Sequence, residues 1–204
     1  MIYTVLRENQ PHLGFIEATR VPVINTDTSD LAELAAYKKL DLSNKFIGFE
    51  HVRRYFSTKH GRPLTEEELI KKLGDKDIIV PSIQMMPLKE WIHPSTFAYT
   101  NKICRLHPEY KDAVDEVLNG TTMYPHNMLF TRSKTFKEYR SWLFNIIGTG
   151  GTVCTDPKAK SHYGETLLTI YCKHNFKHST VTCNVTAWSH DLSHIVDTIS
   201  GVGD

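Results

Sequence analysis

Short apolar runs rich in β-branched residues recur along the chain, and each is bounded by polar or turn-forming residues. Runs of this length are typical of buried β-strands, because a helix needs a longer stretch to bury one face. We therefore expect strands at residues 2–6, 21–24, 46–49, 77–81 and 128–130. The proline at position 81 ends the fourth run, since proline cannot donate a hydrogen bond to a central strand.

Pairs of polar residues three positions apart predict where helices begin. The capping-box spacing occurs at Asp30 with Glu33, Thr65 with Glu68, and Thr135 with Glu138. Apolar residues at helical spacing follow each pair, and Gly74 ends the second helix. Pro108 and the Asn119-Gly120 pair bound another helix, and the glycine-rich residues 148–152 predict a flexible loop. We expect helices at residues 30–40, 65–73, 108–118, 135–147 and 166–171.

Strands that alternate with helices predict an α/β fold with a mostly parallel central sheet. The sequence has no repeats, low-complexity tracts or linker that would divide it, so we expect residues 1–204 to form a single domain. In open α/β sheets, ligands bind beyond the carboxyl ends of the strands. Residues 50–55, which follow the apolar run 46–49, therefore mark the expected active edge.

The composition is that of an ordinary folded protein and excludes several classes. Of the 204 residues, 40% are hydrophobic and 23% are charged, and the net charge is +1, which gives no global attraction to nucleic acid or to a membrane surface. No stretch approaches the roughly 20 apolar residues of a membrane span. The N-terminus lacks the features of a secretion signal, so we expect a cytoplasmic protein with reduced cysteines.

Two adjacent arginines follow the apolar run 46–49, with a histidine just before them. Arg53 and Arg54 suit a diphosphate, because guanidinium groups bind phosphate oxygens bidentately and stay charged, and His51 lies two positions earlier. The alternative is that the arginines form salt bridges at the end of a strand. The pattern alone leaves both interpretations open.

Polar residues beside two other elements offer further candidate chemistry. Asn127 follows His126 before the run 128–130, and an amide both donates and accepts hydrogen bonds, as discrimination among sugar hydroxyls requires. An ordinary turn asparagine is the alternative. Glu165, preceded by Tyr163 and Gly164, is a candidate general base near an acceptor hydroxyl, and a glutamate favoured by the helix dipole is the alternative.

Metal-binding motifs are incomplete in this sequence. Cys172, His174 and His178 have no second ligand cluster that would complete a zinc motif. The Asp-x-Asp pair that holds the metal of a nucleotide sugar does not follow the run 46–49. Only Asp75-Lys76-Asp77 has that form, and its second aspartate begins a strand instead of ending one. The residues therefore predict no metal site.

The order of several short motifs adds a further indication. The most specific is the His-x-Arg-Arg-Tyr-Phe block at residues 51–56, and the others lie at residues 34–37, 46–50, 77–81, 127–130, 139–144 and 163–168. Together they resemble, from end to end, the family of uncharacterised domains found in bacterial capsular-polysaccharide glycosyltransferases, which has relatives in viruses. The matching segments lie between residues 30 and 172.

The resemblance implies a single GT-A-like, Rossmann-like domain that binds a nucleotide sugar. The implied activity is transfer of the sugar, from a UDP-sugar donor, to a saccharide hydroxyl with inversion at the anomeric carbon. A divalent cation, Mn²⁺ or Mg²⁺, is compatible with this family as a cofactor. The resemblance places Tyr3 and Thr4, at the first strand, near the base. Within the motifs it implies diphosphate contact for His51, Arg53 and Arg54, sugar contact for Asn127, and the role of catalytic base for Glu165. His126, Tyr163 and Gly164 would lie on the acceptor side.

Departures from the family pattern motivate two alternatives. Val52 replaces a tyrosine of the block, residues 38–41 replace a tryptophan-rich helix end, and the chain is short enough for a compact viral member. Residues 132–177 carry eight Lys or Arg against three acidic residues, which motivates a phage or viral DNA glycosyltransferase acting on a hydroxymethylated base. The missing Asp-x-Asp pair motivates a non-catalytic sugar- or nucleotide-binding module.

Overall fold

The structure, a computed structural model, describes residues 1–7, 20–25, 32–81, 83–84, 87–90, 94–148, 157–189 and 195–199. Its centre is a sheet in the order β10-β9-β5-β8-β3-β1-β2, with β4 paired to both β3 and β9. The strands of this sheet are β1 (Ile2–Arg7), β2 (Val21–Asn25), β3 (Phe46–His51), β4 (Arg54–Ser57), β5 (Ile78–Pro81), β8 (Leu129–Arg132), β9 (Thr180–Trp188) and β10 (Ile195–Ile199). A small separate sheet pairs β6 (Ile83–Gln84) with β7 (Thr122–Met123).

The sheet is mixed, which corrects the expectation of a mostly parallel one. β1 runs parallel to β2 and β3, and β5 runs parallel to β9. The pairings of β3 with β4, β3 with β8, β5 with β8, β4 with β9, and β9 with β10 are antiparallel. The tight turn at residues 52–53 sends β4 back along β3 as a hairpin, so no helix can intervene and the pair must be antiparallel.

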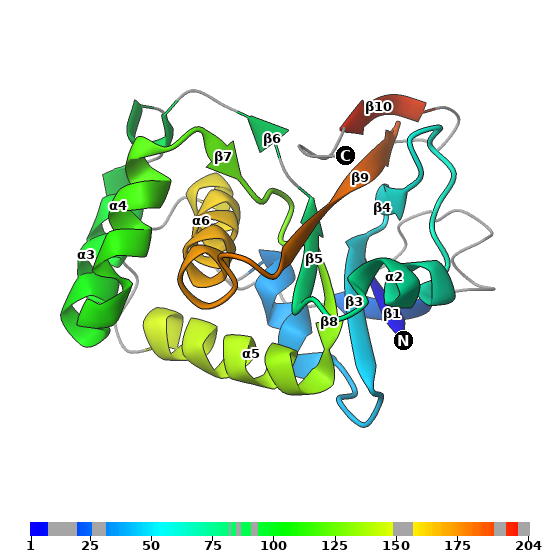
Figure 1. The fold of residues 1–204 in the computed structure, drawn as a ribbon, viewed down its shortest axis with the longest axis horizontal. Coiled ribbons are helices and arrows are strands. Elements are labelled where there is room, and N and C mark those ends of the chain that lie inside the picture. The colour runs from blue at the N-terminus through cyan, green and yellow to red at the C-terminus, as the bar shows by residue number, and fades with distance from the viewer. Residues whose placement is uncertain are drawn as a thin grey trace.

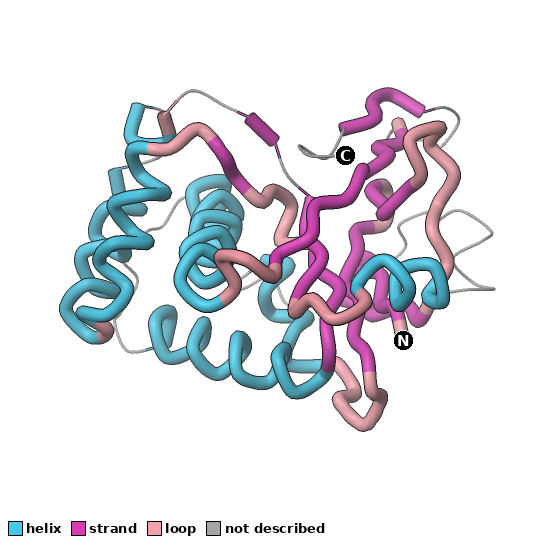
Figure 2. Tube along the Cα trace, viewed as in Figure 1, coloured by secondary structure: helices cyan, strands magenta, loops and turns pink. Residues whose placement is uncertain are grey.

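Helices cover both faces of this sheet. The α-helices are α2 (Glu66–Leu73), α3 (Pro94–Leu106), α4 (Lys111–Asn119), α5 (Ser133–Gly148) and α6 (Pro157–Asn175), and the 3₁₀ helices are η1 (Ala32–Lys39), η2 (Leu88–Glu90) and η3 (Pro108–Tyr110). Figure 1 shows α3 to α6 grouped on one side of the sheet and α2 on the other, with the strands forming the band between them in Figure 2. Within the described ranges, none of the helices combines the length and apolar character that crossing a membrane would require.

Two apolar clusters follow from this layering. The larger cluster contains residues of η1, α3, α4, α5 and α6 together with one face of the strands, and the smaller contains α2 residues and the opposite face. Side chains alternate between faces along a strand. Accordingly Tyr3 belongs to the larger cluster and Ile2 to the smaller one. Tyr37 of η1 anchors the larger cluster, since its ring lies edge-on to Phe49 with centroids 4.5 Å apart.

Several of the expected helices are confirmed. Thr65 and Glu68 form both hydrogen bonds of a capping box at the start of α2, and Gly74 ends that helix with a positive φ of 53°. Residues 108–118 form η3 and α4, and residues 166–171 lie inside the longer α6. Residues 32–39 form a 3₁₀ helix, while Asp30 and the expected loop residues 149–152 lie outside the described residues.

One expected helix start is wrong. α5 begins at Ser133 instead of Thr135, because the chain turns directly from β8 into the helix. The Ser133 backbone N–H donates to the Lys45 carbonyl at 3.0 Å, and its hydroxyl donates to the Asn44 carbonyl. These bonds to the loop before β3 fix the start of the helix two residues earlier than the sequence predicts.

Candidate functional site

The candidate site lies at the carboxyl end of β3, where three segments distant in the sequence meet. β3 and β8 are antiparallel with Phe49 opposite Leu129, so His51 and Asn127 come together two residues further along. His51 Nε2 donates a hydrogen bond to the His126 carbonyl oxygen. Because a carbonyl can only accept, this bond places the proton on Nε2 of His51.

Residues 124–127, here called the 124–127 turn, have an unusual backbone. His126 and Asn127 have positive φ values of 68° and 52°, in the left-handed region that few side chains other than asparagine adopt readily. The turn is therefore held in a conformation that its surroundings must stabilise.

Side chains from η1 and α6 supply that stabilisation. The Tyr37 hydroxyl donates to the Asn127 carbonyl at 2.5 Å. Glu165 Oε1 accepts the His126 backbone N–H at 2.7 Å, and Thr169 Oγ1 accepts the Tyr124 N–H at 3.0 Å. One carboxylate and two hydroxyls thus fix the turn from both sides.

The Asn127 amide is buried without a hydrogen-bond partner. The residue is only 1% exposed, and neither its Nδ2 nor its Oδ1 has a partner in the described part of the chain. A buried polar group left in this state costs about 1–3 kcal/mol of stability. Native structures retain such groups rarely, so each one is a candidate for ligand recognition.

Gly164 of α6 makes this burial possible. A Cβ atom at position 164 would lie 2.5 Å from Asn127 Oδ1 and 2.9 Å from Leu34 Cδ1. Any side chain there would displace the amide, so glycine is required by close approach. The helix backbone therefore packs directly against the Asn127 side chain.

The histidine of the turn is electrically neutral. Burial, and secondarily the positive charges of Arg54 and His51, lower the pKa of His126 to about 2. Its Nδ1 lies 4.0 Å from Glu165 Oε1, but a neutral ring at that distance does not form an ion pair.

Arg53 binds the main chain of β9. Its Nη1 donates to the Trp188 carbonyl at 3.2 Å, and the Trp188 N–H donates to the Arg53 carbonyl at 2.8 Å. Arg54 begins β4 and lies opposite Ala187 in register. Both arginines are half-buried. The described hydrogen bond of the Arg53 side chain is to a backbone carbonyl. A salt bridge at the end of a strand would instead use a carboxylate.

The structure separates Thr4 from this group. Thr4 lies opposite Glu50 on β3, and the alternation of side chains puts both on the α2 face, whereas His51 lies on the other. Tyr3 is on the same face as His51, but its hydroxyl donates to the Asp41 carbonyl at 2.9 Å. The Thr4 hydroxyl is buried and has no partner within the described ranges.

Sequence analysis did not identify the ion pair next to Thr4. Arg20 Nε lies 2.8 Å from Glu50 Oε2, and both side chains are almost fully buried. Glu50 Oε1 accepts the Phe56 N–H at 2.9 Å. Burial raises the pKa of Glu50, and the Arg20 guanidinium opposes that shift. A charged residue at the end of an otherwise apolar strand was the available signal.

Tyr163 packs inside the larger cluster. Its ring lies against Tyr99 of α3 with centroids 3.6 Å apart, and its hydroxyl has no partner among the residues described. Burial raises the pKa of Tyr163 far above its ordinary value. The phenol therefore stays protonated and offers a donor at neutral pH.

Metal ligands are not gathered in the described residues. No group of three or more His, Cys, Asp or Glu side chains there is arranged to hold an ion. Cys172 is buried, which raises the pKa of its thiol, whereas His174 and His178 are exposed. Cys104, Cys172 and Cys183 are free thiols, and Cys154 lies outside the described residues.

Comparison with solved structures identifies the fold. The chain is similar to the apo structure of the WbbM bifunctional glycosyltransferase, with a TM-score of 0.73 and 19% sequence identity over 95% of this chain. It spans 45% of the WbbM chain. A weaker similarity, with a TM-score of 0.44 and 14% identity, covers 73% of this chain and 44% of core-mannan synthase A from Aspergillus fumigatus in its Mn/GDP form.

Comparison with sequences gives the family. No curated protein sequence matches significantly. Residues 29–176, which include η1, the 124–127 turn and Glu165, match one family model. The chain belongs to the family described as a domain of unknown function, DUF4422.

Proposed function

We propose that this protein is a glycosyltransferase that moves a sugar from a nucleotide-sugar donor, a UDP-sugar, to a saccharide hydroxyl. The fold shared with WbbM, at a TM-score of 0.73, supports the general activity. The observation that carries the proposal is the meeting of His51, the 124–127 turn and Glu165 at the carboxyl end of β3. This is the edge where α/β sheets bind ligands.

The donor would bind through cationic and amide groups. Arg53 and Arg54 are half-buried, and they would bind the diphosphate with His51 beside them. Asn127 would recognise the sugar, since its amide has both donors and acceptors to offer. Tyr3 would contact the base from β1, whereas Thr4 lies on the α2 face and is left out of the proposed donor site.

Glu165 would act as the general base on the acceptor side, with His126, Tyr163 and Gly164 around the acceptor. The acceptor hydroxyl oxygen attacks the anomeric carbon while its proton passes to the Glu165 carboxylate. The bond from the anomeric carbon to the diphosphate oxygen breaks, and its electron pair leaves with the nucleoside diphosphate. Attack opposite the leaving group inverts the configuration at the anomeric carbon.

A divalent cation remains compatible with this proposal. The described carboxylates and histidines do not form a three-ligand group, so no step above depends on a metal. Assays with and without Mn²⁺ or Mg²⁺ test whether one contributes.

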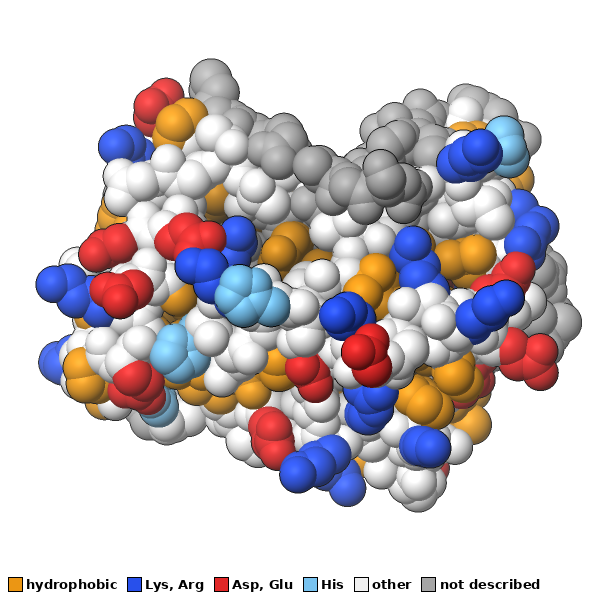
Figure 3. All heavy atoms as spheres, viewed as in Figure 1, with side chains coloured by type: hydrophobic (Ala, Val, Ile, Leu, Met, Phe, Trp, Pro, Cys, Tyr) orange, Lys and Arg blue, Asp and Glu red, His pale blue; other side chains and the backbone are white. Residues whose placement is uncertain are grey.

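The DNA-modifying alternative has weaker support. At least three of the eight basic side chains in the segment 132–177 are engaged within the protein: Lys173 and Lys177 lie 2.9 and 3.4 Å from Glu116, and Arg132 donates to the Lys76 carbonyl at 2.6 Å. Lys, Arg, Asp and Glu side chains are interspersed over the face seen in Figure 3. A continuous phosphate-binding surface would need an excess of positive charge.

The decisive experiment is a donor and acceptor screen with Glu165→Gln. Purified protein is incubated with UDP- and GDP-sugars, glycans and hydroxymethylated DNA, and products are read by mass spectrometry. Glutamine keeps an oxygen that can accept the His126 N–H, so the fold should persist while the rate falls about 10²- to 10⁴-fold. Glu67→Gln, an exposed position on α2, is the matched control and should retain full activity.

Three outcomes would contradict these assignments separately. Failure to bind or turn over any nucleotide sugar would refute the glycosyltransferase. Donor binding without turnover would favour a non-catalytic binding module. Full activity of Glu165→Gln, with turnover by the unaltered protein, would remove only the role of Glu165 as the base.

A further inference from the structure

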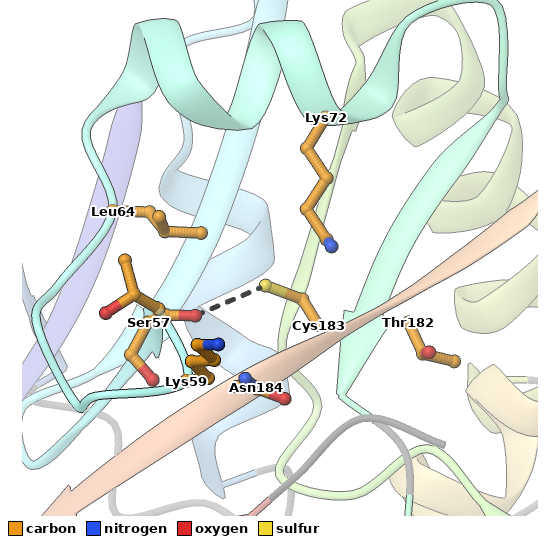
Figure 4. Close-up of a pocket in the computed structure, with 8 residues that line it drawn as sticks. Ser57, Lys59, Leu64, Lys72, Thr182, Cys183 and Asn184 are labelled. Atoms are coloured by element: carbon orange, nitrogen blue, oxygen red, sulfur yellow. Dashed lines mark hydrogen bonds between the residues drawn. The ribbon is translucent and has the colours of Figure 1, made fainter. Parts of the chain in front are cut away.

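A second concave site lies on the α2 face of the sheet. It is a cavity of about 180 Å³ between the end of β4, the last turn of α2 and the middle of β9. Ser57, Lys59, Lys72, Cys183 and Asn184 are among its lining residues (Figure 4). Leu64 and Cys183 belong to the smaller apolar cluster, so this cavity is separated by the sheet from the larger cluster beneath the 124–127 turn.

Two lysines line the cavity from different elements. Figure 4 shows the Lys72 side chain extending from α2 toward Cys183, while Lys59 lies in the segment that follows β4. Both lysines are exposed. Neither forms an ion pair with any carboxylate of the described residues. None of the described residues that line the cavity is acidic.

Two other positive groups near α2 have a carboxylate partner, whereas Lys59 and Lys72 have none among the described residues. Arg62 Nη2 lies 2.6 Å from Glu68 Oε1, and the Met1 ammonium lies 2.5 Å from Glu66 Oε1. The carboxylates of Glu66 and Glu68 are therefore already engaged with other groups. Within the described ranges, no carboxylate compensates the charges of Lys59 and Lys72 at the cavity.

The rest of the lining is neutral. The Cys183 thiol donates to the Ser57 carbonyl at 3.9 Å, and burial raises the pKa of Cys183 to about 11. Thr58, Thr182 and Asn184 add hydroxyl and amide groups. The cavity is smaller than the roughly 300–1,000 Å³ of sites for drug-sized ligands. Its size and charge suit a compact dianion with several oxygen acceptors.

We propose that this cavity binds a phosphate group, held by the ammonium groups of Lys59 and Lys72 on the face of the sheet opposite the candidate active site. Lysine binds phosphate as a point charge, and two ammonium groups match the double charge of a phosphate monoester or of inorganic phosphate. The Thr58 hydroxyl, whose oxygen accepts the Arg62 N–H at 3.3 Å, can supply a neutral donor. The site is independent of the proposed glycosyl transfer.

Titration with inorganic phosphate tests this site directly. Amide resonances of the full-length protein are followed by NMR at constant ionic strength, with chloride as the reference anion. Saturable shifts are expected at residues 57–59, 72 and 182–184. The double variant Lys59→Gln with Lys72→Gln should weaken binding by about 10-fold for each ammonium removed. Lys71→Gln, exposed on α2 outside the cavity lining, should bind as the unaltered protein does.

The source of the phosphate is distinguished by parallel titrations with a hexose phosphate and with glycerol phosphate, the latter representing a lipid headgroup. The ligand that binds most tightly among inorganic phosphate, the hexose phosphate and glycerol phosphate identifies the source. Thermal unfolding confirms that each variant is folded. Absence of saturable shifts at these amides, or equal affinity in the double variant and the Lys71→Gln control, would overturn the proposal.

Discussion

Glu50 and Asn127 lie near the same end of the sheet, both buried, and differ in whether their polar atoms are satisfied. Glu50 uses one oxygen for Arg20 and the other for the Phe56 N–H. The Asn127 amide has no partner among the described residues. Complete hydrogen bonding is what a structural polar group needs, whereas an unsatisfied amide has its bonding capacity left for something else. The comparison separates a polar group with a structural role from one whose proposed role is recognition.

The largest expected effect comes from breaking the satisfied pair. Arg20→Met leaves the Glu50 carboxylate buried without its counter-ion and should lower the free energy of unfolding by about 3–5 kcal/mol, measured by denaturant titration. Adding Glu50→Gln should recover part of that loss, because the uncompensated charge is then gone. Arg62→Met removes an exposed partner of Glu68 and should change stability far less. An equal loss in the Arg20 and Arg62 variants would contradict the structural role of the buried pair.

An intermediate effect is expected from acid. The pKa of His126 is about 2 in the folded protein against an ordinary value of 6.5. Between these values the unfolded chain binds a proton that the native turn does not, so stability is complete above pH 6.5 and falls below it. At pH 5 this histidine should account for a loss of about 2 kcal/mol relative to pH 7.

His126→Asn tests the acid effect without disturbing the backbone. Asparagine does not titrate and tolerates the left-handed φ of this position. Unfolding curves of this variant should therefore lose less stability between pH 7 and pH 5 than those of the unaltered protein. His178→Asn, at an exposed position, should alter the pH dependence less. Identical pH dependence in His126→Asn and the unaltered protein would show that the ring titrates in the folded state.

The smallest change in stability is expected where the amide is unsatisfied. Asn127→Leu removes the buried amide and its cost of about 1–3 kcal/mol, while a leucine at a left-handed φ costs roughly 1–2 kcal/mol, so the net change should lie between a loss of about 1 and a gain of about 2 kcal/mol. Donor binding, followed by calorimetry with the nucleotide sugar that the screen identifies, should be lost. A large loss of stability would instead mean that the amide is structural.

The local signals in the sequence predict much of the fold. The Thr65 capping box and Gly74 define α2 because both act within a few residues. Strand direction has no local signal, and for this reason the mixed sheet was not anticipated. β9 was not assigned, although Val181, Cys183, Val185 and Ala187 alternate with polar residues as a half-buried strand requires. α3, β4 and β10 were also not assigned.

The sequence predicts which residues belong to the candidate site better than it predicts how they are arranged in space. His51, His126, Asn127 and Glu165 are all identifiable as polar residues beside apolar runs. Their meeting depends on the β3 and β8 register and on the left-handed 124–127 turn. The direction of the Thr4 side chain follows from alternation along β1, but only once its pairing with β3 is known.

The close packing of Gly164 against Asn127 couples α6 to the 124–127 turn. With no side chain at position 164, the backbone of α6 packs directly against the amide, so the amide cannot move toward α6 without displacing the helix. A sugar that pushed the amide toward α6 would therefore displace the helix and, with it, the ring of Tyr163 that packs against Tyr99 of α3. Binding of a sugar at Asn127 would therefore shift Tyr163 on the proposed acceptor side.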